Sequence, residues 1–310
     1  MEVQDGQTEY TGAIDTGITA AQARELYEAD QKVRKRRRSP WFTVFVIAMI
    51  VLVASLGALG VIAFSYLQGQ QKYDAIAQTS DFNPTQLENG LSATVDWDAL
   101  LAANPDTAAW LYIPNTVVNY PVVQGQDNDH YLYYDFDGNQ GWLAEYGAIF
   151  LDYRNKRDFS DPVSFIYGHH MNDGSMFASI AQMADQARFD ECRTQYVLSP
   201  GGNYRLRSFA LVHCGADEPI VETTFASRKD MVAYIQDKMD RSMVAVGDAP
   251  PAESIRKVFA LATCDNYSAG RYILFCYVED TTASGLSGNI GLGTNEEGQT
   301  VGFDNGLAPE

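Results

Sequence analysis

The sequence predicts a mainly β fold of the α+β class that follows one membrane-spanning helix. From position 109 onward, eight short segments alternate as strands do, and Gly, Asn, Asp and Pro separate them. Such short strands favour a closed barrel or a sandwich over a parallel α/β sheet. The predicted strands are Trp110 to Ile113, Val117 to Gln124, Gly147 to Asp152, Val163 to His169, Gln195 to Leu198, Tyr204 to Cys214, Arg256 to Cys264 and Arg271 to Glu279.

Two helical inserts interrupt the predicted strands. The first runs from Ser175 to Gln186. The second runs from Arg228 to Asp240, where Met231, Ile235 and Met239 recur at a spacing of four residues. Ahead of the strands, the segment from Leu67 to Leu101 is expected to be largely helical. In it, Asn83 is a candidate N-cap before Pro84 at a first helical position.

The membrane span is predicted from a long apolar run. No charged residue occurs from Ser39 to Gln71, and Trp41 to Leu67 is almost wholly apolar. As a helix this run reaches roughly 40 Å, which is enough to cross a hydrocarbon core of about 30 Å with some tilt. A cleaved signal peptide is the alternative, but the run is long for one and no small-residue cleavage site stands out.

The orientation of the span follows from the positive-inside rule. Only Lys72 is basic close behind the span, whereas a basic cluster precedes it directly: Lys32, Arg34, Lys35, Arg36, Arg37 and Arg38. We therefore expect a cytoplasmic tail at 1–38 with a short helix near Ala20 to Gln31, and an anchor at 39–69. An extracellular domain at 70–280 and a disordered polar tail at 281–310 would follow.

The charge of the chain argues against nucleic-acid binding. The formal net charge is -18, and the first 69 residues carry seven basic and seven acidic residues, which leaves 15 basic and 33 acidic residues for the rest. An acidic surface repels phosphate backbones.

Four cysteines, Cys192, Cys214, Cys264 and Cys276, follow the span, and none forms a CxxC pair. A zinc site is therefore not suggested, and we expect neither a metal nor a cofactor. Disulfides are permitted outside the cell but are not required in a domain of this size.

Strand periodicity separates one cysteine from the others as a candidate nucleophile. In its strand, Cys264 shares a face with Ala262, and in the next strand Arg271 shares a face with Ile273, whereas Cys276 points to the other face. The two strands are joined by a short link, so we expect them to pair and to bring Arg271 beside Cys264.

This pairing suits nucleophilic catalysis. Nearby positive charge lowers the pKa of a thiol, and a guanidinium can hold the negative oxygen that forms when a thiolate attacks an amide. A histidine would carry the proton of the departing amine. His169 and His170 both follow a strand and point to opposite faces, so periodicity leaves both open, while His130 and His213 are less attractive.

The sequence resembles the class B sortases, Gram-positive transpeptidases that attach exported proteins to the cell wall. The matching segments are ANPDTAAWLYIPNTVVNYPVVQGQDNDHYLYYDFDG from Ala103, GAIFLDYRN from Gly147, FIYGHHMNDGSMFASI from Phe165 and LATC ending at Cys264, followed by Arg271. The resemblance implies an eight-stranded sortase-type β-barrel with N-terminal helices. The sequence departs from the family in ALATC, where another first residue is usual, and in a short link after Cys264.

Carried over to this chain, the resemblance implies Cys264 as nucleophile, His169 as the histidine directly after Tyr-Gly, and Arg271 as charge stabiliser. It also implies candidate substrate-binding residues at Asn128, Leu132, Thr263 and Asp265. The implied reaction cleaves a C-terminal sorting motif of an exported protein through a thioester. The acceptor would be an amine of a cell-wall peptide or of a pilin. Two alternatives remain open here, a hydrolytic cysteine peptidase and a non-catalytic membrane-tethered barrel that binds ligands.

Overall fold

The computed structural model describes residues 17–37, 40–87, 90–140, 146–215, 217–264 and 270–283, and for 34–37 and 264 it describes the backbone alone. The chain divides into two compact units, Met1–Val61 and Ile62–Glu310. Most of the predicted polar tail at 281–310 lies outside the described residues.

The first unit holds helix α1 (Ala20–Arg37) and the beginning of helix α2 (Pro40–Thr79). The helix predicted near Ala20 to Gln31 is present and continues to Arg37. In α2, an 18-residue window has a mean hydropathy of 2.8 and no buried residue. Within the described part of the chain, α2 is the one helix that is long and apolar enough to cross a membrane.

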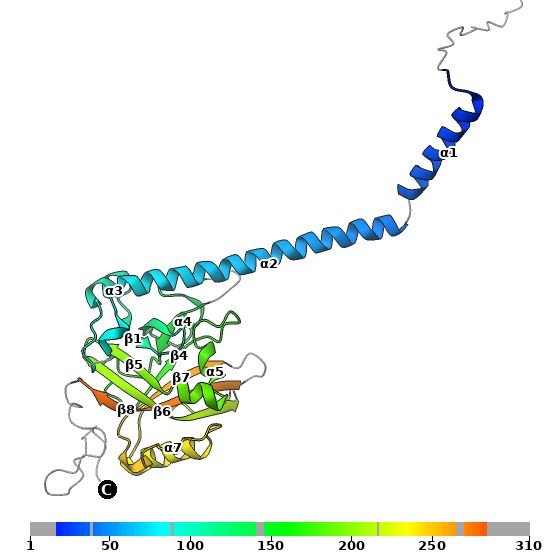
Figure 1. Cartoon of the computed structure of the whole chain (residues 1–310). Coiled ribbons are helices and arrows are strands. Elements are labelled where there is room, and N and C mark those ends of the chain that lie inside the picture. Colours follow the sequence, from blue (N-terminus) through cyan, green and yellow to red (C-terminus); the bar gives the residue numbers. More distant parts are fainter. Residues whose placement is uncertain are drawn as a thin grey trace, which may run out of the picture. The chain divides into compact units, whose positions relative to one another are not determined.

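The second unit is built on a closed barrel of eight strands, as predicted (Figure 1). The strands follow the order β1-β2-β3-β4-β7-β8-β6-β5 around the barrel. Two neighbouring pairs, β2 with β3 and β4 with β7, are parallel, and the others are antiparallel. The bounds are β1 Thr107–Tyr112, β2 Asn119–Val123, β3 Ile149–Leu151, β4 Val163–Tyr167, β5 Thr194–Ser199, β6 Gly202–Gly215, β7 Val258–Cys264 and β8 Gly270–Thr281.

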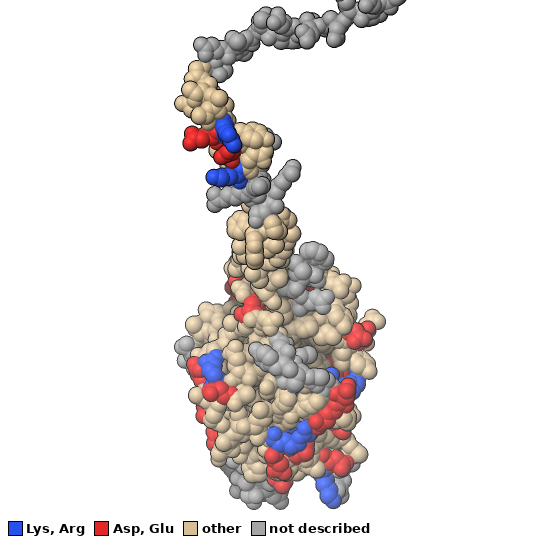
Figure 2. All heavy atoms as spheres, turned by 90° about the vertical axis from the view of Figure 1, so that its right-hand side faces the viewer, with Lys and Arg blue, Asp and Glu red and all other residues tan. Residues whose placement is uncertain are grey.

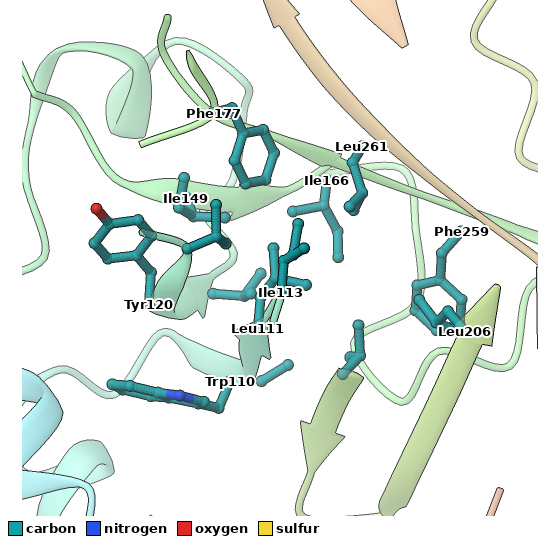
Figure 3. Packing of buried hydrophobic residues seen from close by; sticks show 14 of the residues in the cluster. Trp110, Leu111, Ile113, Tyr120, Ile149, Ile166, Phe177, Leu206, Phe259 and Leu261 are labelled. Carbon is teal, nitrogen blue, oxygen red and sulfur yellow. The ribbon is translucent and has the colours of Figure 1, made fainter. Parts of the chain in front are cut away.

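Strands β7 and β8 bury both of their faces in two different cores. Leu261 of β7 and Ile166 of β4 point into the main core inside the barrel (Figure 3). The alternate residues, such as Ala262 and Ile273, belong to a second core that also contains Met231 and Ile235 of helix α7 (Arg228–Asp240). The predicted strand phase is therefore confirmed. Because side chains alternate along a strand, the positions of Cys264 and Arg271 fall in phase with the residues of the second core.

Helix α2 ends at Thr79, and the segment up to Leu101 is less helical than predicted. A short 3-10 helix η1 (Pro84–Leu87) follows, the described residues 90–96 are not helical, and Asp96 caps helix α3 (Trp97–Ala103). Asn83 does act as a local cap, because its Oδ1 accepts a hydrogen bond from the backbone N–H of Thr85 at 3.0 Å.

The insert predicted from Ser175 to Gln186 is divided into two short helices, α5 (Ala178–Gln182) and α6 (Gln186–Glu191). The break occurs at Asp185, which is extended and whose carboxylate caps α6 by accepting from the N–H of Arg188. The insert from Arg228 to Asp240 is confirmed as α7. Two further elements are α4 (His130–Tyr133) and the 3-10 helix η2 (Ala252–Ser254).

On the face shown in Figure 2, several groups of acidic side chains of the second unit lie beside basic ones, and uncharged surface separates these groups. Some of these neighbouring acidic and basic side chains form ion pairs. Asp248, for example, pairs with both Arg193 at 2.6 Å and Arg207 at 3.0 Å. The acidic excess is thus partly compensated locally.

Candidate active site

Cys264 and Arg271 are direct partners in the antiparallel pair of β7 and β8. Residues that face each other in such a ladder project to the same side of the sheet. Arg271 is held from its other side as well, because β6 pairs it with Cys214. The predicted pairing of the two strands is confirmed, and it places Arg271 beside the position of Cys264.

His169 follows β4, which runs parallel to β7 in the same sheet. Tyr167 is the register partner of Ala262, and the N–H of Gly168 donates to the Ala262 carbonyl at 3.1 Å. His169 and Cys264 each come two residues after this aligned pair. The carboxyl ends of the two parallel strands therefore bring His169 and Cys264 to the same edge of the barrel.

The imidazole of His169 is anchored on a backbone carbonyl. Its Nε2 lies 2.6 Å from the oxygen of Leu132, at the end of α4. Because a carbonyl oxygen can only accept a hydrogen bond, Nε2 carries the proton and Nδ1 remains as the nitrogen for proton exchange. The Leu132 carbonyl thus fixes the orientation of the imidazole.

His170 is directed elsewhere. It forms an isolated β-bridge with Met176 and lines a separate cavity of about 360 Å³ together with Tyr272 of β8. Tyr272 projects to the face opposite that of Arg271. The structure therefore brings His169 to the cavity that Arg271 lines, and it brings His170 to a different one.

A cavity of about 330 Å³ opens where these strands end. Its volume lies in the range of small-molecule sites, and apolar and polar residues both line it. The lining residues are Asn128, Asp129, Leu132, Phe150, Arg154, Tyr167, Gly168, His169, Val221, Ala262, Thr263 and Arg271. Of the four predicted substrate-binding residues, Asn128, Leu132 and Thr263 are thus at this cavity, and Asp265 lies outside the described residues.

Thr263 is 2% exposed, and its Oγ1 has no hydrogen-bond partner among the described residues. A buried hydroxyl without a partner is costly and commonly marks a site completed by another group. A role of Thr263 in substrate binding stays a prediction.

The buried carboxylate of Asp152 organises one wall of the cavity. Its oxygens accept hydrogen bonds from Nε and from one terminal nitrogen of Arg154 at 2.9 and 2.8 Å, from Asn128 at 3.0 Å and from the Tyr167 hydroxyl at 2.9 Å. Burial alone would raise the pKa of Asp152, but these hydrogen bonds outweigh it and the pKa is lowered. Asp152 therefore stays ionised and fixes three lining side chains.

Arg154, Asp152 and the Leu132 carbonyl were not among the predicted site residues. Asp152 and Arg154 are two residues apart in the segment GAIFLDYRN, a spacing that lets the two side chains meet. That spacing was the available signal. The Leu132 carbonyl is a backbone group and leaves no side-chain signal.

The cysteines other than Cys264 are buried free thiols. Burial raises the pKa of Cys192, of Cys214 and of Cys276, the last to about 12. Cys276 lies in the main core, in contact with the Ser208 hydroxyl at 3.5 Å. A raised pKa is the opposite of what a thiolate nucleophile requires. For Cys264 the structure describes the strand position and not the side chain.

Comparison with known proteins gives a consistent result. No family model matches the chain. The chain is 34% identical to sortase B of Listeria monocytogenes over 174 residues, which are 55% of this chain and 69% of that protein. It is 24% identical to sortase B of Staphylococcus aureus over 233 residues, which are 74% of this chain and 92% of that protein.

The fold is also that of solved sortase B structures. The structure of sortase B from Listeria monocytogenes aligns with a TM-score of 0.52 at 32% identity, covering 58% of this chain and 98% of that one. The Bacillus anthracis sortase B in complex with AAEK1 aligns with a TM-score of 0.59 at 25% identity, covering 69% and 98%. These relatives do not favour a hydrolytic peptidase or a non-catalytic barrel. The chain belongs to the class B sortases and is a cysteine transpeptidase with an eight-stranded sortase barrel.

Proposed function

We propose that the Cys264 thiolate attacks a threonine carbonyl in the C-terminal sorting motif of an exported protein. Arg271 stabilises the tetrahedral oxyanion, and His169 protonates the departing amine, which leaves an acyl-enzyme thioester. An amine of a cell-wall peptide or of a pilin then attacks the thioester and releases Cys264. The bond broken in the first step is the peptide bond after threonine, and the bond formed in the last step is a new amide.

The observation that carries this proposal is the convergence of three strand ends on one cavity. Cys264 ends β7, Arg271 is the second residue of β8 and lies opposite it, and His169 follows β4 on the other side. A nucleophile, a proton carrier and a permanent cation at one edge meet the geometric needs of acyl transfer. The thiols of Cys192, Cys214 and Cys276 are buried with raised pKa values, which supports Cys264 as the nucleophile.

The donor peptide would lie in the 330 Å³ cavity. Asn128 and Leu132 would contact it from the α4 side, and Thr263 would contact it from β7. Asp265 is proposed as a fourth contact on the strength of the family resemblance alone. A solved complex bears the description "Staphylococcus aureus sortase B-substrate complex", which concerns that protein.

We further propose that the chain crosses the plasma membrane once, with the N-terminus in the cytoplasm and the catalytic domain outside. The apolar part of α2 supports a single span, and the basic cluster ahead of it supports the orientation. In this proposal residues 1–38 form the tail, 39–69 the anchor, 70–280 the catalytic domain and 281–310 a disordered tail. A residue-specific test is a cysteine introduced at the exposed Ser92 or at Thr8, followed by labelling of intact cells with a membrane-impermeant maleimide. Labelling at Thr8 and not at Ser92 would contradict the orientation.

The reaction is tested on the full chain in detergent, with a panel of short threonine-containing sorting peptides and with or without an added amine. Mass spectrometry would follow the acyl-enzyme and the amide product. Cys264→Ala is expected to abolish both, and Cys276→Ala is the matched control because it removes a buried thiol outside the cavity. Full turnover by Cys264→Ala would refute the nucleophile assignment. Peptide cleavage that yields no amide product when the amine is added would show hydrolysis in place of transfer.

The two adjacent histidines provide a second comparison. His169→Ala is expected to lower kcat by about two to four orders of magnitude, which is the usual contribution of general acid and base catalysis. His170→Ala should have a small effect because His170 lines the other cavity. The reverse ranking would mean that the proton carrier is His170.

A further inference from the structure

The ring of His169 rests against a glycine from a distant loop. Gly147 has a φ of +54°, and a Cβ there would lie 2.8 Å from Cδ2 of His169 and 2.8 Å from the Leu132 oxygen. The backbone at Gly147 therefore packs against both the imidazole and the carbonyl that accepts its Nε2 proton. Movement of this backbone would free the ring.

A tyrosine of helix α2 holds that glycine in place. The hydroxyl of Tyr73 donates to the carbonyl oxygen of Gly147 at 2.6 Å. Tyr73 is 4% exposed, and its ring packs edge-on against Tyr120 of β2 with centroids 5.2 Å apart. The donor is thus fixed by packing and aimed at the loop that touches His169.

The same face of α2 makes a second connection to the segment that follows His169. The hydroxyl of Tyr146 donates to the carboxylate of Asp173 at 2.7 Å, and it lies 2.9 Å from the backbone oxygen of Tyr66. Gln70 of α2 also donates to Asp173, at 3.3 Å. Positions 66, 70 and 73 follow the spacing of one helix face, so a single side of α2 supports the loops before and after the imidazole.

We infer that this face of α2 positions His169, and that Tyr73 is the positioning residue that acts through Gly147. The inference deepens the proposed function, because it rests on His169 as the proton carrier. Tyr73 has no part in the chemistry itself. Its hydroxyl restrains the Gly147 backbone, which keeps the Nε2 proton of His169 on the Leu132 carbonyl and leaves Nδ1 for proton exchange. The support for the imidazole therefore begins in α2, upstream of position 70.

The test is Tyr73→Phe in the full chain in detergent, which removes the hydroxyl and keeps the buried ring. We expect kcat for acyl transfer to fall about tenfold, a part of what general acid and base catalysis contributes. KM should stay unchanged, because Tyr73 does not line the peptide cavity. The limb of the pH–rate profile that reports the histidine should shift as well. Tyr204→Phe is the matched control, since Tyr204 is equally buried, at 2% exposure, and packs on Phe159 and Phe259.

A second measurement does not depend on activity. Side-chain ¹⁵N NMR of the four histidines, assigned with His169→Gln, reports which ring nitrogen carries the proton. The wild type and Tyr204→Phe should have His169 protonated at Nε2, and Tyr73→Phe should have a mixture of the two tautomers. An unchanged tautomer together with wild-type kcat and pH profile in Tyr73→Phe would overturn the inference. A wild-type chain without transpeptidase activity would instead count against the proposed function, and the NMR comparison would still decide the role of Tyr73.

Discussion

Arg271 lies directly opposite Cys264 on β8, with Cys214 as its partner on the far side. In the barrel β8 lies between β7 and β6, and pairing on both sides restrains the backbone that carries the guanidinium. A restrained cation beside the proposed nucleophile would meet a developing oxyanion without reorganisation, which is the basis of electrostatic catalysis.

Replacement of Arg271 tests this relationship. Arg271→Ala is expected to lower kcat by about 10² to 10³, the usual cost of losing one oxyanion donor, with little change in KM. Arg271→Lys should recover only part of the loss, because an ammonium lacks the planar fork of donors. Steady-state kinetics with a sorting peptide and an amine would measure both. Arg207→Lys, in a surface ion pair with Asp248, is the control. Wild-type kcat in Arg271→Ala would rule out the proposed role.

The thiols should differ in reactivity. At pH 7.5, iodoacetamide is expected to alkylate one cysteine first, and Cys264→Ala should remove that fast reaction. Cys276 should stay unmodified in the folded chain because burial raises its pKa to about 12 and keeps the thiolate population negligible. Intact mass and peptide mapping over time would measure the order. Equal fast labelling in the wild type and in Cys264→Ala would mean that another thiol is activated.

Periodicity along the chain predicted much of the barrel. Every predicted strand is present, because turn residues bound each one and the alternation of side chains is clear. The short link between β7 and β8 was enough to predict their pairing and so the neighbourhood of Cys264 and Arg271. Residue type and strand phase therefore predicted that Arg271 lies beside Cys264 and that Cys276 points to the other face.

The supporting contacts could not be predicted in the same manner. Tyr73 reaches Gly147 across 74 positions, and His169 reaches a backbone oxygen at Leu132, so neither contact leaves a local pattern. The sequence predicted helix from Leu67 to Leu101, whereas α2 ends at Thr79, after a last part in which Tyr73 and Ile76 are buried.

The Asp152 carboxylate should affect substrate binding more than chemistry. Asp152→Asn is expected to loosen Arg154, Asn128 and Tyr167, and so to raise KM several-fold with a smaller change in kcat. The loss of charge-assisted hydrogen bonds should also lower the free energy of unfolding by about 1–3 kcal/mol. Kinetics and urea unfolding would measure the two effects. An unchanged KM would mean that this wall does not contact the peptide.

The pH dependence of the same group has a definite sign. The folded pKa of Asp152 is below its usual value, so its stabilising contribution is present above about pH 4 and is lost as the pH falls through the folded pKa. Asp152→Asn lacks this ionisation. The stability difference between wild type and variant should therefore shrink on acidification, and a difference that grows would contradict the hydrogen-bond account.

A buried lysine just before β7 gives a slope of the same sign in a more alkaline window. Lys257 is 3% exposed, its Nζ donates to the Asp161 carbonyl at 2.7 Å and to Ser164 at 3.2 Å, and burial lowers its pKa to about 7. Between that value and its ordinary pKa of 10.5, the unfolded chain binds more protons than the folded one. The unfolding free energy of the wild type should therefore rise with pH in this window, by at most about 1.4 kcal/mol per pH unit.

Lys257→Met removes this titration while it keeps an apolar stem of similar length. Relative to the variant, the wild type should gain stability from pH 7 to pH 10. Below pH 7 the difference should not change with pH, because Lys257 is then protonated in both the folded and the unfolded chain. Urea unfolding of the full chain in one detergent, followed by near-UV circular dichroism at each pH, measures the difference. Lys229→Met is the control, since Lys229 is exposed. A difference between wild type and Lys257→Met that does not change above pH 7 would mean that Lys257 keeps an ordinary pKa, with its ammonium hydrated by water in the folded domain.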